Sequence, residues 1–224
     1  MKRSSKTLLV SAITAAAIST GVSTAHAYFS ANAGFVSDYY FRGSNLGDAG
    51  LYAGLDYENS GFYAGTWWID DSNAGNDGLE QDVYFGYGFD AGSISLGLGY
   101  TRYEYTYTSD FEQEINLSAG FSGFGLEYSA GEDDDDGGDT VDYDFVALSW
   151  SGEVFGAKIG SYDPDEFKNG LVEYDYIELS ASGEVAELDA TITIGQTSNT
   201  RDASGDIASG DGYMILDISK SFDL

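Results

Sequence analysis

Cysteine is absent from the 224 residues, and the chain has a single histidine and a single proline. His26 lies in an N-terminal stretch that we expect to be removed, so the mature chain lacks histidine as well. Ser-His-Asp and Cys-His catalysis, hydrolysis with a histidine base, and zinc bound by histidine or cysteine are therefore excluded. The sequence predicts neither an enzyme nor a protein with a cofactor or a metal centre, and no disulfide can form.

Basic residues are scarce, with 9 Lys and Arg against 38 Asp and Glu and a net charge of -29. Loss of Lys2, Arg3 and Lys6 with the N-terminal stretch leaves six basic residues and a net charge near -32. Such a surface is unsuited to nucleic acid, whose phosphates need basic partners. The 18 Tyr, 13 Phe and 3 Trp residues nevertheless favour a folded chain over an acidic disordered one.

Long apolar runs are also missing after the N-terminus. Basic residues precede a short apolar run from Leu8 to Val22, and Ala25-His26-Ala27 matches a small-residue cleavage site. Residues 1-27 therefore read as a secretory signal peptide for the general secretory pathway, and residues 28-224 form the mature protein. No later stretch reaches the eighteen apolar residues of a membrane helix.

Strand-like alternation fills the rest of the chain. From Tyr213 to Leu224, apolar and polar residues alternate up to the last residue, as in the closing strand of an outer-membrane barrel. We predict twelve strands, at about 28-41, 51-57, 61-69, 79-89, 93-103, 111-121, 124-131, 141-150, 154-162, 172-182, 187-196 and 213-224. Short and long connections alternate between them, which is typical of periplasmic turns and external loops. The predicted fold is an all-β, antiparallel, up-and-down transmembrane barrel.

Each predicted strand has one apolar and one polar face, except strand 141-150, where both faces are apolar. Aromatic residues of the apolar face gather near the strand ends, Phe41 among them on the side of the long loops, as in the girdles of membrane barrels. A secreted β-sandwich is the alternative fold.

Carboxylates dominate the polar faces, which would line the interior of the barrel. The candidate lumen-lining residues are Asp38, Arg42, Asp56, Glu80, Asp82, Glu112, Glu114, Glu127, Lys158, Glu178, Asp189 and Asp217. A narrow passage lined by one sign of charge concentrates counter-ions, so we expect a diffusion channel for small cationic or neutral solutes. The alternative is a plugged, non-conducting barrel with a structural or surface-interaction role, because twelve strands lie between filled and open barrels.

The N-terminal third of the chain carries a family resemblance. Gly34-Phe35-Val36-Ser37-Asp38-Tyr39-Tyr40-Phe41-Arg42-Gly43, with Gly54-Leu55-Asp56-Tyr57 and the segment from Ser60 to Trp67, resembles the TorF-like porins of proteobacteria. The resemblance implies an outer-membrane barrel and a channel, without catalytic residues to transfer. This chain departs from the family pattern after Gly43, so the role of the loop that follows does not carry over.

Two surface features predict partners. Phe222 and Leu224 form the terminal signal expected to engage the barrel-assembly machinery, after delivery by periplasmic chaperones. The acidic run from Glu132 to Asp139 is interpreted as a solvated loop, with loose binding of divalent ions as the alternative. Outer-membrane lipid and lipopolysaccharide would surround the barrel.

Overall fold

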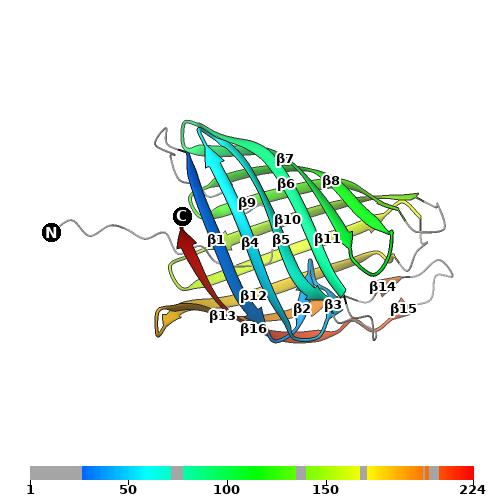
Figure 1. Cartoon of the computed structure of the whole chain (residues 1–224). Coiled ribbons are helices and arrows are strands. Elements are labelled where there is room, and N and C mark those ends of the chain that lie inside the picture. The colour runs from blue at the N-terminus through cyan, green and yellow to red at the C-terminus, as the bar shows by residue number, and fades with distance from the viewer. Residues whose placement is uncertain (1–26, 72–77, 135–139, 167–170, 199, 202–206) are drawn as a thin grey trace.

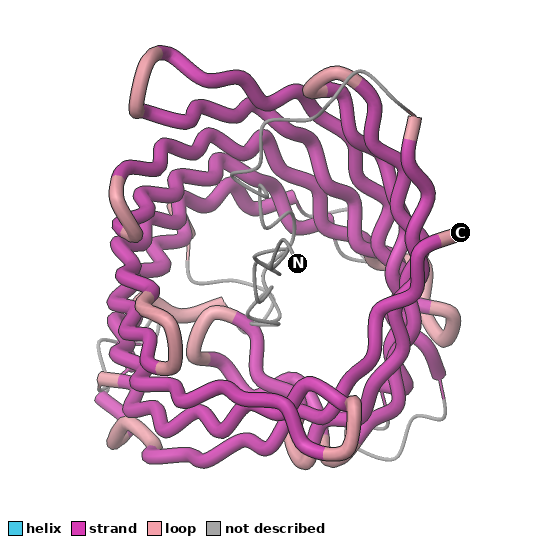
Figure 2. The backbone as a smooth tube through the Cα atoms, turned by 90° about the vertical axis from the view of Figure 1, so that its left-hand side faces the viewer, coloured by secondary structure: helices cyan, strands magenta, loops and turns pink. Residues whose placement is uncertain are grey.

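A computed structural model describes residues 27-71, 78-134, 140-166, 171-198, 200-201 and 207-224. Twelve of its strands form one closed antiparallel barrel in the order β1-β16-β13-β12-β11-β10-β9-β8-β7-β6-β5-β4. Seen along the barrel axis, the strands enclose a single interior, the lumen (Figure 2). The predicted fold class and strand number are therefore confirmed, and the sandwich alternative is wrong. The expected signal peptide lies outside the described residues, apart from Ala27.

All twelve predicted strands are present, and all except the first have boundaries close to those expected. They are β1 (Tyr28–Val36), β4 (Gly50–Asn59), β5 (Phe62–Asp71), β6 (Gly78–Ala91), β7 (Ile94–Tyr105), β8 (Phe111–Phe121), β9 (Phe124–Asp134), β10 (Thr140–Ser151), β11 (Phe155–Pro164), β12 (Tyr174–Val185), β13 (Leu188–Thr197) and β16 (Gly212–Asp223). The short pair β14 (Thr200–Arg201) and β15 (Ile207–Ala208) lies in the connection before β16. The described residues contain no helix of the length and hydrophobicity that a membrane crossing requires.

The two ends of the barrel differ in their connections. At one end, which we call the short-turn end, turns such as Ser60-Gly61 and Ser122-Gly123 place both residues at positive φ. Two consecutive residues of this kind define the type I′ turn, whose twist matches that of the flanking strands. The longer connections, which follow β1, β5, β7, β9, β11 and β13, lie at the opposite end, which we call the long-loop end. The C-terminus lies at the short-turn end, beside the start of β1 (Figure 1).

Closure joins the first and last strands of the barrel. β1 pairs antiparallel with β16, with Ala31 opposite Phe222 and Val36 opposite Asp217. The amide of Leu224 also donates a hydrogen bond of 3.0 Å to the carbonyl of Phe29. The terminal strand thus leaves no free edge beside β1, which removes a template for aggregation.

The outer surface of the barrel is apolar over the middle of the strands. Exposed side chains there include Leu98 on β7, Ile115 on β8, Leu148 on β10, Ile177 on β12 and Ile192 on β13. Carboxylates take the same outward positions toward the long-loop end, where Asp142, Asp163 and Asp175 are exposed. An apolar belt that ends in polar residues is what a barrel embedded in lipid presents.

Inward side chains pack into two clusters of buried residues. One contains Val36, Tyr39, Tyr52, Ile69, Tyr213 and Ile215. The other contains Tyr143, Phe145, Ala147, Tyr162, Tyr174 and Tyr176. The second cluster explains why both faces of β10 are apolar. The inner face of β10 packs against other side chains in the lumen, and the outer face of β10 belongs to the apolar belt.

The connection between β1 and β4 differs from the expectation. The sequence predicts a first strand that runs to residue 41 and an external loop over 42-50, and this prediction is wrong. The chain bends at Ser37 and Asp38, and then forms a hairpin of β2 (Tyr39–Phe41) and β3 (Ser44–Gly47). Phe41 therefore belongs to this hairpin and packs on an inner cluster instead of joining an outer girdle.

Candidate functional site

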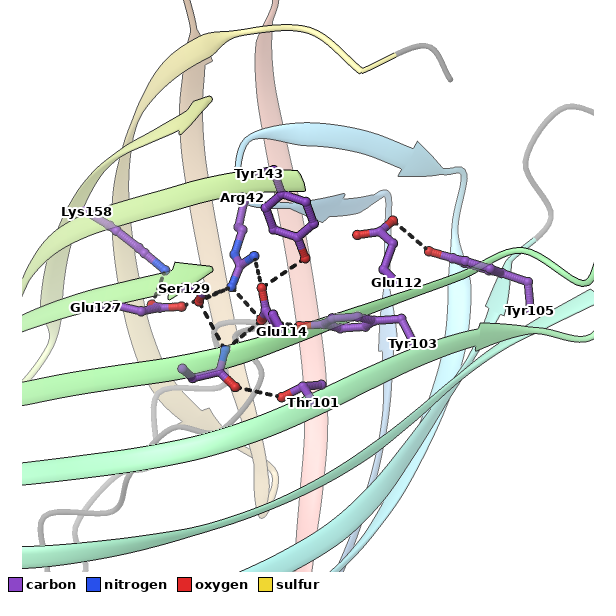
Figure 3. A network of polar contacts seen from close by, with 11 residues as sticks. Arg42, Thr101, Tyr103, Tyr105, Glu112, Glu114, Glu127, Ser129, Tyr143 and Lys158 are labelled. Atoms are coloured by element: carbon purple, nitrogen blue, oxygen red, sulfur yellow. Dashed lines mark hydrogen bonds and ion pairs between the residues drawn. The ribbon is translucent and has the colours of Figure 1, made fainter. Parts of the chain in front are cut away.

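The β2–β3 hairpin brings its turn, Arg42-Gly43, against the inner wall of the barrel (Figure 3). Both turn residues have positive φ, 51° for Arg42 and 83° for Gly43. A two-residue type I′ turn is among the commonest connections of a β-hairpin, and it places the Arg42 side chain at the hairpin tip. Arg42 is only 6% exposed.

Glu114 on β8 receives the Arg42 guanidinium through two parallel hydrogen bonds. Nη1 donates to Oε2 at 2.7 Å and Nη2 donates to Oε1 at 2.8 Å. Nη2 also donates to the Ser129 hydroxyl on β9 at 3.0 Å. Bidentate arginine–carboxylate pairs fix orientation as well as distance, so the hairpin tip has one defined position on the wall.

Aromatic rings surround the same guanidinium. Its carbon lies 4.0 Å from the centre of the Phe145 ring on β10 and 4.7 Å from that of Phe41. A cation over an aromatic face is stabilised by the ring quadrupole, and more so where water is excluded. The apolar inner face of β10 therefore has a role in holding Arg42.

Glu114 is itself held by several other donors. The hydroxyls of Tyr103 and Tyr143 donate to it at 2.8 and 3.1 Å. The Asn116 amide donates at 2.7 Å, and Asn116 in turn accepts from Thr101. A buried carboxylate with this many donors stays ionised at low energetic cost.

The hairpin is also anchored to the wall through residues other than Arg42. Tyr39 donates a hydrogen bond of 2.7 Å to Glu80 on β6. Tyr40 stacks on Tyr213 of β16, with ring centres 4.0 Å apart. Thr197 on β13 donates to the carbonyl of Gly43 at 2.5 Å. The hairpin therefore contacts strands on several sides of the lumen.

The remaining candidate residues lie along the inner wall, several with a tyrosine as partner. Asp56 accepts from Tyr84, Glu178 from Tyr213 and Glu112 from Tyr105. Asp217 accepts from Tyr52 at 2.9 Å, although the two residues are 165 positions apart. A phenol donates a hydrogen bond without adding charge, so these contacts orient the carboxylates and leave the wall acidic.

Basic residues balance only part of this charge. Lys158 on β11 lies 3.4 Å from Glu127, which is also 3.4 Å from Arg42.

The three remaining candidate carboxylates lie in different surroundings. Asp82 is buried on β6, two positions from Glu80. Asp189 lies half-buried opposite Ser219 of β16, and Asp38 lies half-buried in the bend before β2, outside the strand predicted for it.

Two features of the site are not predicted by the sequence: the tyrosine partners of the carboxylates and the inward hairpin. The tyrosines that hold the carboxylates alternate with the same period as their partners, but pairing them requires the strand register. The inward hairpin was missed because Tyr39 to Phe41 continues the alternation of β1. The sequence feature that could have indicated the hairpin is Arg42-Gly43, because glycine is typical of the second position of a two-residue hairpin turn.

The metal and assembly predictions rest on other parts of the chain. Glu132 to Asp134 belong to β9, and residues 135-139 of the acidic run lie outside the described residues. Within the described ranges, no three His, Cys, Asp or Glu side chains are grouped so that they could hold a metal ion. Phe222 and Leu224 are exposed at the short-turn end, and their role as an assembly signal stays a prediction.

Comparison with known families adds one assignment. The family model described as "Bacterial protein of unknown function (Gcw_chp)" matches residues 20–210. The chain belongs to this family. The match covers the whole barrel up to the start of its last strand, the inward hairpin included. The resemblance to TorF-like porins stays a prediction beside it.

Solved structures share the architecture at low sequence identity. An outer membrane channel from Pseudomonas putida F1 is 8% identical, with a TM-score of 0.51 over 88% of this chain and 95% of that chain. OpdK of Pseudomonas aeruginosa, solved with vanillate, is 13% identical, with a TM-score of 0.44 over 80% of this chain. This chain spans 57% of the length of OpdK. No curated protein matches. The first similarity supports the barrel fold and nothing finer.

Proposed function

We propose that the protein is an outer-membrane channel through which small cationic or neutral solutes diffuse. The observation that carries the proposal is the contrast between the two surfaces of the closed barrel. Its outer face is apolar, while carboxylates such as Asp56, Asp217 and Glu178 lie on the inner face. An acidic lining in a narrow passage favours cations over anions.

The proposal extends to the surroundings of the protein. Export would use the expected signal peptide, and periplasmic chaperones and the barrel-assembly machinery would deliver and insert the barrel. Outer-membrane lipid would contact the apolar belt, and lipopolysaccharide would lie beside the acidic residues above it. No catalytic role is part of the proposal, and nucleic acid is not an expected partner.

Planar bilayers with a salt gradient test the selectivity. We expect single-channel currents whose reversal potential has the sign of cation preference. Neutralising three inner carboxylates together, by Asp56→Asn, Glu178→Gln and Asp217→Asn, should reduce that preference. The matched control removes three charges from the outer face, by Asp142→Asn, Asp163→Asn and Asp175→Asn, and should leave the selectivity unchanged. A reversal potential that favours anions in the unmodified protein would rule out the proposed selectivity.

A second function is favoured by the hairpin. Side chains at its level, among them Tyr39, Glu114, Ser129 and Phe145, are almost completely buried. A barrel filled at this level would be a non-conducting structural or surface-interaction protein. Absence of conductance in bilayers, together with liposomes that fail to swell in small neutral solutes, would favour this second function.

A further inference from the structure

The β2–β3 hairpin lies toward the long-loop end (Figure 1), and its side chains pack against residues of the inner wall. Its side chains or turn carbonyl contact residues of β5, β6, β7, β8, β9, β10, β13 and β16. They are eight of the twelve barrel strands, with β5 to β10 as one run of neighbours and β13 with β16 as another. A segment with contacts on so many sides narrows the space that a solute could use.

The hairpin is too short to hold this position by its own pairing. β2 has three residues and β3 has four, and their register shifts between Tyr39 and Tyr40. Isolated two-stranded hairpins are marginally stable, so contacts with the wall must fix this one. The strongest of them is the Arg42–Glu114 pair, because it is ionic, bidentate and shielded from water.

We propose that the β2–β3 hairpin is the constriction of the channel and that the Arg42–Glu114 ion pair holds it across the lumen; this inference rests on the proposed channel function. Arg42 and Glu114 then determine both the width of the passage and its local charge. Loss of either partner removes the ionic contact of the tip, leaving the Thr197–Gly43 hydrogen bond there, and it also leaves an unbalanced charge of known sign beside the passage.

The two partners therefore give opposite signatures in one experiment. Both Arg42→Ala and Glu114→Gln should increase the single-channel conductance severalfold, because each removes the strongest contact that holds the hairpin across the lumen. Arg42→Ala should raise the cation-to-anion permeability ratio by up to about 25-fold, because one unit charge at close range in water favours the cation and disfavours the anion by up to about fivefold each. Glu114→Gln should lower that ratio by a similar factor. Arg102→Ala removes a positive charge from the outer face, where Arg102 pairs with Glu104, and should change neither quantity.

A thiol reporter tests whether the Arg42–Glu114 pair holds the hairpin, without any measurement of current. The chain has no cysteine, so Ser129→Cys creates a single thiol at a residue that is 0% exposed and bonded to Arg42. A small water-soluble maleimide should label it slowly in the otherwise unmodified barrel. Adding Arg42→Ala should accelerate labelling about tenfold, because a buried thiol reacts only when its surroundings open. Heat-dependent migration in detergent gels verifies that each variant is folded, and Glu114→Gln carries the test if Arg42→Ala does not fold.

The possible results separate the two proposals. Channels that conduct equally in the unmodified protein, Arg42→Ala and Glu114→Gln, with unchanged labelling, overturn the constriction and leave the channel function in place. Faster labelling in a barrel that never conducts supports the role of the Arg42–Glu114 pair in holding the hairpin and overturns the proposed channel function. Conductance that rises in both variants, with opposite shifts of selectivity, supports both.

Discussion

Ile192→Arg is expected to prevent most of the protein from assembling as a barrel in lipid bilayers. Ile192 lies on the outer face of β13, 48% exposed, between Ala181 of β12 and Leu216 of β16. All three positions belong to the apolar belt, where an arginine would have to contact lipid chains. Arginine near the midplane of a membrane barrel costs about 2–4 kcal/mol, and much less near the interfaces. Folded fraction after dilution from urea into liposomes, measured by heat-dependent gel migration, gives the outcome.

Gln196→Arg is the matched control for this experiment. Gln196 lies on the same strand and the same face, exposed, but four residues closer to the long-loop end. An arginine there can reach the headgroup region with its long side chain, so assembly should be nearly normal. Replacing Lys220, which is paired with Glu187 near the short-turn end, should also have little effect. Equal losses for Ile192→Arg and Gln196→Arg would argue against placing the belt in a membrane.

The twelve barrel strands could be predicted from the sequence because each is a local feature. Alternation fixes which residues share a face, and turn residues such as Ser122-Gly123 mark where a strand ends. The alternation of apolar and polar residues is therefore enough to predict that Asp56, Glu80 and Asp217 share the inner surface of the barrel. The apolar inner face of β10 was the one irregularity, and it coincides with the part of the wall that receives Arg42.

The contacts that build the site could not be predicted in the same way. Tyr52 and Asp217 are brought together only by closure of the barrel, through the pairing of β1 with both β4 and β16. The hairpin depends on a bend at Ser37 and Asp38 that leaves no trace in the alternation. The sequence predicts Arg42 at the end of the first strand, whereas it lies at the tip of the hairpin. Its partner Glu114 lies 72 positions away, so only tertiary structure reveals the pair.

Gly195→Ala should destabilise the barrel strongly, although it adds one methyl group. A Cβ at Gly195 would lie 2.1 Å from Cζ of Tyr213, its cross-strand neighbour on β16. The Tyr213 ring is fixed by its stacking on Tyr40 and by its hydrogen bond to Glu178, so it has little freedom to move. Overpacking of this kind costs typically about 1–3 kcal/mol. Unfolding by urea in detergent micelles should therefore occur at a lower urea concentration than in the unmodified protein.

The pairing of glycine with tyrosine recurs around the inner wall, so the same effect should appear elsewhere. Gly34 faces Tyr52, Gly131 faces Tyr143 and Gly160 faces Tyr176, each with a Cβ-to-ring approach below 2.5 Å. Gly183→Ala is the control, because nothing lies within 4 Å of its Cβ position. Combining Gly195→Ala with Tyr213→Ser should cost less than the sum of the single changes, since the smaller side chain leaves room for the methyl group. Strict additivity, or an equal loss for Gly183→Ala, would show that backbone propensity and not the Tyr213 ring determines the effect.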